Sequence, residues 1–67
     1  ARATDAEARR VRADALTHAL SCIDACNAQG IEWDEETLSH NIKCSFPELT
    51  TDECDDIAAS AARRSQA

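Results

Sequence analysis

The side chains of this chain that could do chemistry are four cysteines and two histidines, and most of them lie at helical spacings. They are Cys22, Cys26, Cys44, Cys54, His18 and His40. His18, Cys22 and Cys26 follow one another at intervals of four residues, and His40 and Cys44 repeat that interval. Residues four apart project from one face of an α-helix, one turn from each other. The pattern allows disulfide bonds, a metal site or free thiols.

Disulfide bonds are the interpretation that we favour. Cys22 and Cys26 project in parallel from one helix face, so they are poorly placed to bond to each other. Each is therefore expected to bond to Cys44 or Cys54. Either bridge would close a loop of more than twenty residues and would add ~3 kcal/mol to stability.

The expected helix packing chooses between the two remaining pairings. If the second helix runs back along the first, Cys44 lies level with about residue 18. If the third helix then reverses direction, Cys54 lies level with about residues 20–24. The predicted disulfides are therefore Cys22–Cys44 and Cys26–Cys54, with the crossed pairing as the alternative.

A zinc site is the first alternative to disulfides. Cys22, Cys26, His40 and Cys44 could supply four ligands from two facing helices, which suits tetrahedral zinc. Such a site requires thiolates and a neutral imidazole, and it leaves Cys54 unused. The second alternative is four free thiols in a reducing cytoplasm, acting as small hydrophobic residues. Outside the zinc alternative, no cofactor is expected.

Enzyme activity is not expected. The histidine–cysteine pairs have the spacing of a base and a nucleophile, but three short helices offer little concave surface for a substrate. The chain contains no Gly-x-Ser-x-Gly motif, and its single glycine, Gly30, excludes a glycine-rich phosphate loop.

Composition limits the remaining possibilities. The chain has 67 residues, enough for one domain over residues 1–67, and about half of its hydrophobic residues are alanine. So small a core favours a covalent staple or a partner. The net charge of −6 argues against nucleic-acid binding, and no run approaches the ~20 apolar residues of a membrane span. The chain as given has neither a signal peptide nor an initiating Met, which indicates a leader removed on export or trimming from a longer chain.

The sequence predicts an all-α domain of three helices, over about residues 5–29, 35–44 and 51–65, held by the two disulfides. No run alternates polar and apolar residues long enough to predict a strand. Gly30 is expected to end the first helix in a left-handed conformation. Pro47 is expected to stop the second helix at or before Ser45, because the residue that precedes a proline disfavours helical torsions.

Local motifs predict where the three helices begin. Thr4 and Glu7 form a capping box, in which each side chain accepts a hydrogen bond from a free backbone amide. Thr50 and Glu53 repeat this arrangement ahead of the third helix. Asp34 is a favourable N-cap for the second.

Two groups of residues are candidates for binding a partner. Trp33 is expected to pack on the second helix as a hydrophobic staple, and the alternative is an aromatic anchor ringed by Glu32 and Glu35. Arg9 and Arg12 form a basic strip on the first helix, for pairing with nearby acids or for contact with another chain.

The predicted function is that of a small, acidic, disulfide-stabilised protein, secreted or periplasmic, that binds another protein or a second copy of itself. The first dozen residues of the long helix extend beyond what two short helices can cover, so we expect another copy or a partner to cover them. The alternatives are the zinc-binding module and a cytoplasmic regulator that blocks a basic site on a nucleic-acid enzyme.

Overall fold

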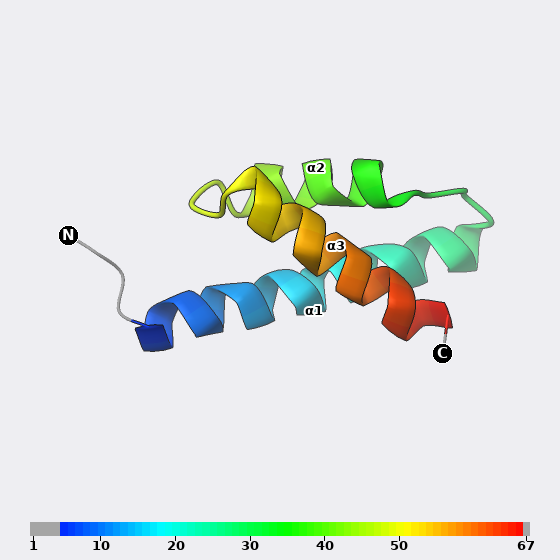
Figure 1. The fold of residues 1–67 in the computed structure, drawn as a ribbon. Helices are drawn as coiled ribbons and strands as arrows, with labels where there is room; N and C mark the ends of the chain where they lie inside the picture. Colours follow the sequence, from blue (N-terminus) through cyan, green and yellow to red (C-terminus); the bar gives the residue numbers. More distant parts are fainter. Residues whose placement is uncertain (1–4, 67) are drawn as a thin grey trace.

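The computed structural model describes residues 5–66, which form three α-helices and no strand (Figure 1). They are α1 (Asp5–Gln29), α2 (Glu35–Ser45) and α3 (Thr51–Gln66). These bounds lie within one residue of the predicted ones. The expectation of an all-α, three-helix fold is confirmed.

α2 runs back along the C-terminal half of α1, and α3 crosses both of them obliquely (Figure 1). α3 packs more extensively on α1 and on α2 than those two pack on each other. The first turns of α1 extend beyond the other helices, and residues 5–10 are exposed. The overhang is therefore shorter than the predicted dozen residues, because Arg12 already pairs with Glu53 of α3 and Ala15 is buried.

Two of the three predicted helix starts lie within the described residues, and both are confirmed. The Asp34 carboxylate accepts a hydrogen bond from the backbone amide of Thr37 at 2.7 Å. Thr50 and Glu53 form the reciprocal capping box, with N–O distances of 3.1 Å and 3.0 Å. Thr4, the first residue of the other predicted capping box, lies outside the described residues.

The core is small and rich in alanine, as the composition predicts. Its buried residues are Ala15, Ala19, Ile23, Leu38, Ile42, Leu49, Cys54, Ile57, Ala58 and Ala61. Alanines on α1 and α3 allow these helices to approach closely but bury little area each, whereas a fully buried Ile or Leu contributes ~1.5–3 kcal/mol. Most of the hydrophobic stabilisation therefore comes from five aliphatic residues. No helix in the described part of the chain is both long and apolar enough to cross a membrane.

Candidate functional site

All four cysteines are free thiols in the structure. The predicted disulfides, Cys22–Cys44 and Cys26–Cys54, are therefore not formed, and neither is the crossed pairing. Cys22 and Cys26 are partly buried, Cys44 is exposed and Cys54 is completely buried.

The register between α1 and α3 explains why Cys26 does not meet Cys54. Arg12 of α1 forms an ion pair with Glu53 of α3, at 2.6 Å. Cys54 therefore lies near the level of Arg12 rather than that of residues 20–24. Cys26 is 14 residues further along α1, a separation of about 21 Å, whereas a disulfide requires Cα atoms within ~7 Å. The predicted level of Cys54 was wrong.

The register between α1 and α2 agrees with the prediction, but the sulfur atoms of Cys22 and Cys44 do not meet. Ser45, the neighbour of Cys44, has its Oγ 3.3 Å from Nε2 of His18. Cys22 Sγ lies 3.6 Å from the same His18 nitrogen, and Cys44 Sγ lies 3.6 Å from Nε2 of His40. Each sulfur thus contacts a histidine one turn earlier on its own helix.

His18 links α1 to the end of α2. Its ring packs edge-to-face against Phe46, with 5.8 Å between ring centroids. Its Nε2 faces the Cys22 thiol and the Ser45 hydroxyl together, and the tautomer determines whether this nitrogen donates or accepts. The contacts give His18 a packing role between two helices.

The alternative zinc site is not assembled. Its four residues were Cys22, Cys26, His40 and Cys44. Within residues 5–66, no three His, Cys, Asp or Glu side chains are grouped so that they could hold a metal ion. The four-residue spacing instead places His18 beside Cys22 on α1 and His40 beside Cys44 on α2.

Cys54 acts as a small hydrophobic residue. It is buried between α2 and α3, and this burial raises the pKa of its thiol, although the Lys43 ammonium opposes the shift. A buried thiol of raised pKa is a poor nucleophile. Its surroundings match the free-thiol alternative.

A different feature, the connection between α1 and α2, gathers surface residues with binding character. Gly30 has a φ of 71°, the left-handed conformation predicted for it. Its amide donates to the Asn27 carbonyl at 3.2 Å, and the Ile31 amide donates to the Cys26 carbonyl at 2.8 Å. This is a Schellman motif, which places the residue after the glycine against the last turn of the helix. The motif therefore sets Ile31 beside Cys26.

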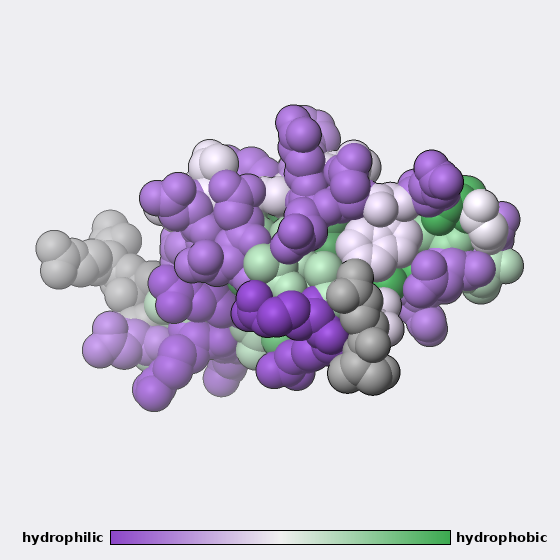
Figure 2. Space-filling view, turned by 45° about the vertical axis from the view of Figure 1, so that its right-hand side comes forward, coloured by the Kyte–Doolittle hydropathy of each residue, from purple (hydrophilic) through white to green (hydrophobic). Residues whose placement is uncertain are grey.

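Ile31 is 52% exposed, and no other large hydrophobic residue among residues 5–66 is classed as exposed. It borders an apolar hollow of about 120 Å³ between α1 and α2. The hollow is lined by Cys22, Ile23, Cys26, Ile31, Glu32, Trp33, Thr37, Leu38 and Asn41. Figure 2 shows hydrophobic residues reaching the surface at this end of an otherwise mostly hydrophilic face.

Trp33 is held in place beside this hollow. It is partly buried, and its indole N–H donates to Oδ1 of Asn27 at 3.2 Å. Trp33 and Leu38 line the hollow together, in the positions of the predicted hydrophobic staple. Trp33 thus packs as the predicted staple and still borders the surface, and its alternative role as an anchor for a partner stays a prediction.

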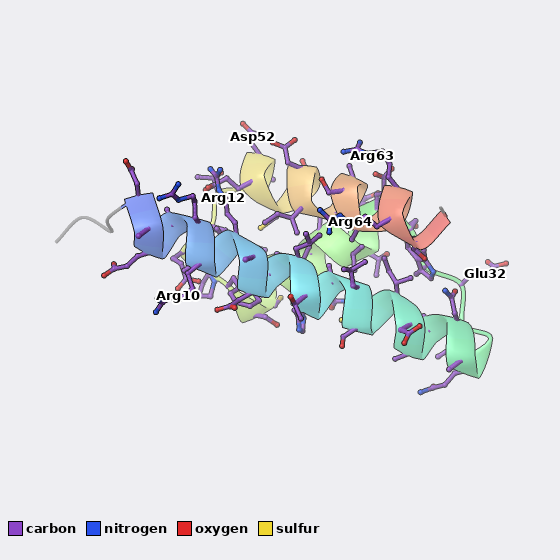
Figure 3. All side chains as sticks on the ribbon, turned by 90° about the horizontal axis from the view of Figure 1, so that it is seen from below. Arg10, Arg12, Glu32, Asp52, Arg63 and Arg64 are labelled. Atoms are coloured by element: carbon purple, nitrogen blue, oxygen red, sulfur yellow. The ribbon has the colours of Figure 1, made fainter. Side chains whose placement is uncertain are left out.

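The same end of the molecule is negatively charged. Glu32 lines the hollow and projects outward from the connection (Figure 3), and Glu35 begins α2. α1 has no basic residue in its last turn, whereas α2 has Lys43 there and α3 has Arg63 and Arg64. The negative end of the α1 dipole therefore has no compensating cation on its own helix.

The basic strip on α1 serves a structural purpose at Arg12. Arg12 donates from Nε and from Nη2 to one Glu53 oxygen, at 3.0 Å and 2.6 Å. Hydrogen bonding by Thr50, followed by that of Arg12, lowers the pKa of Glu53 to about 2. This interhelical pair was missed by sequence reasoning, which assigned Arg12 to acids on its own helix or to a partner. Arg9 is exposed, and its predicted contact with another chain stays a prediction.

We define the Ile31 edge as Ile31, Glu32, Trp33 and Glu35, together with the hollow beneath them. Of the tentative partner residues, Trp33 and Glu32 line the hollow and Glu35 follows in the first turn of α2, while Arg9 and Arg12 lie toward the other end of α1. In comparisons with known proteins, the chain matches no family model, no curated protein and no solved structure.

Proposed function

We propose that this protein acts without catalysis, by binding another protein at the Ile31 edge. The observation that carries the proposal is the exposed Ile31 side chain beside an apolar hollow and an ordered Trp33. A single exposed aliphatic residue needs no explanation. An exposed aliphatic residue next to a hollow lined by an aromatic one is typical of the centre of a protein interface.

The order of the Ile31 edge before binding supports the same proposal. The Schellman hydrogen bonds hold the backbone of Ile31, and Asn27 holds the Trp33 indole. Ordering side chains on association costs ~0.5–1.5 kcal/mol for each flexible group. A surface whose anchors are already held loses less of this free energy when a partner binds.

Export and a disulfide form a separable part of the proposal. Of the two predicted bridges, the register comes nearer to Cys22–Cys44, because Ser45, the neighbour of Cys44, contacts His18, which lies one turn before Cys22. A secreted or periplasmic protein would then carry this one disulfide and two thiols, Cys26 and Cys54. Intact mass two hydrogens below the reduced value, in protein purified from an oxidising compartment, would support this, and a fully reduced mass there would count against it.

Site-specific photo-crosslinking tests the binding edge. A photo-reactive amino acid replaces Ile31 in one variant and Glu48, an exposed residue of the α2–α3 connection, in the control. Irradiation in cells that normally make the protein should give one discrete heavier adduct from position 31 and none from position 48. Adducts of the same mass and yield from both positions would contradict the proposal.

A further inference from the structure

We infer that the partner segment bound at the Ile31 edge carries one aliphatic or aromatic side chain flanked by Lys or Arg. This inference rests on the proposed function and specifies the partner's chemistry. It follows from the size of the hollow, the local charge and the arrangement of the protein's own cations.

The hollow is of a size to take one side chain. Its volume is about 120 Å³, and an apolar cavity of ~150 Å³ can hold a benzene-sized molecule. Cys22, Cys26 and Leu38 give it an apolar floor, and Ile31 and Trp33 stand at its border. An aliphatic or small aromatic side chain that entered it would bury apolar surface against residues such as Ile23 and Leu38.

The surroundings of the hollow are strongly one-sided in charge. Residues 13–42 contain six Asp and Glu and no Lys or Arg. Asp34 is engaged as the N-cap of α2, but Glu32, Glu35 and Asp24 make no hydrogen bond or ion pair within the described chain. The uncompensated end of α1 adds negative potential at the same place.

None of the protein's cations lines the hollow, and three of them are engaged elsewhere in the described chain. Lys43 donates to the carbonyls of the α2–α3 connection, and Arg12 is paired with Glu53. Arg63 donates to Ser60 on its own helix. Figure 3 shows Arg12 toward the opposite end of α1 from Glu32.

These charges select the partner because binding removes water from the edge. A purely apolar segment would desolvate Glu32 and Glu35 without replacing their hydrogen bonds, which is unfavourable. An acidic segment would add repulsion. A segment with Lys or Arg beside its apolar anchor supplies both the ion pairs and the missing cation at the end of α1.

Trp33 makes the test direct, because it is the single tryptophan and the chain has no tyrosine. Purified protein is titrated with a short blocked peptide that has one Leu flanked by Lys in a Ser background. Three matched peptides change the Leu to Ala, every Lys to Ser, or every Lys to Glu. Trp33 fluorescence and the NMR signal of its indole N–H report binding at this edge.

The first peptide should bind saturably and shift the indole signal, and its affinity should fall about tenfold or more between low and high salt, because the charges lie within reach of screening ions. The Ala, Ser and Glu peptides should each bind at least about tenfold more weakly. In the protein, E32Q/E35Q should weaken the first peptide about tenfold, while the control E48Q should leave it unchanged.

The outcomes separate this inference from the proposed function. Equal binding of the Lys and Ser peptides, or an E32Q/E35Q variant that binds as the parent does, overturns the cationic requirement while the edge remains a docking site. No peptide binding, combined with a crosslinked adduct from position 31, also overturns the inference and leaves the function standing. No peptide binding and no adduct removes both.

Discussion

The two connections of this molecule have the same length but are stabilised in different ways. Each has five residues, 30–34 between α1 and α2 and 46–50 between α2 and α3. In the second connection, side chains satisfy the backbone. Lys43 donates to the carbonyls of Pro47 and Leu49, and Thr50 with Glu53 caps the next helix.

The first connection relies mainly on its own backbone. Gly30 and Ile31 donate to carbonyls at the end of α1, and Asp34 caps α2. Ile31 remains 52% exposed, and the Glu32 side chain makes no hydrogen bond or ion pair within the described chain. The difference indicates that the α2–α3 connection maintains the fold, whereas the α1–α2 connection is available for contact with a partner.

The largest expected effect contrasts one hydrophobic residue from each connection. Leu49 is 4% exposed and Ile31 is 52% exposed. L49A should lose ~2–4 kcal/mol because it leaves a cavity in a small core, whereas I31A should change stability by less than ~0.5 kcal/mol. Urea titration followed by circular dichroism measures both. Equal losses would show that the two connections are structurally equivalent.

The alkylation rates of individual cysteines should distinguish the α1–α2 connection from the α2–α3 connection. In the parent, alkylation should be fastest at Cys44 and slowest at Cys54, on the order of tenfold or more apart, because Cys54 is buried and its pKa is raised. I31A should accelerate Cys26 alone, since Ile31 lies against it, and L49A should expose Cys54. Alkylation mapped by peptide mass spectrometry checks this, and acceleration of Cys54 in I31A would contradict it.

The pH dependence of folding stability should reveal the contribution of Glu53, which caps α3 at the end of the α2–α3 connection. The pKa of Glu53 is about 2 in the folded protein against an ordinary value of 4.5. Because the folded pKa is the lower one, its contribution to stability is fully present above pH 4.5 and is lost as the pH falls toward 2. E53Q should be less stable than the parent at pH 7 and should lose less stability over that window. Parallel pH profiles for the two proteins would refute the assignment.

The smallest expected effect comes from adding the cation that α1 lacks. Q29K places a basic residue in the last turn of α1, as α2 and α3 already have. It should raise stability by ~0.3–1 kcal/mol at low salt and weaken binding of the Lys-flanked peptide. Thermal melting and the fluorescence titration measure the two changes, and Q29E is the matched opposite. Unchanged peptide affinity in both variants would show that the α1 helix dipole does not contribute to peptide binding.

Where local interactions dominate, sequence reasoning succeeded. The bounds of the three helices, the left-handed Gly30, the Asp34 cap and the Thr50–Glu53 capping box all depend on residues within a few positions of one another. The level of α2 on α1 was also predictable, because a short connection leaves an antiparallel neighbour little choice of register.

The placement of α3 could not be predicted in the same way. Its oblique crossing brings Glu53 to Arg12 and keeps Cys54 from Cys26. Alanine stripes on both helices permit several crossing angles of similar packing quality, so the angle depends on the sum of many weak contacts. The error in the predicted Cys26–Cys54 disulfide follows from this one unknown, whereas Cys22 and Cys44 stay apart because each sulfur contacts a histidine on its own helix.

The amino-acid sequence by itself determined the three helices, their ends and the acidic character of the chain, since hydrogen bonds and charges between near neighbours suffice for these. The tertiary structure was needed to show which thiols stay apart, that Arg12 pairs with Glu53 of α3, and that Ile31 and Trp33 border one hollow. These features join residues from different helices, and their free energies depend on a packing geometry that no local pattern specifies.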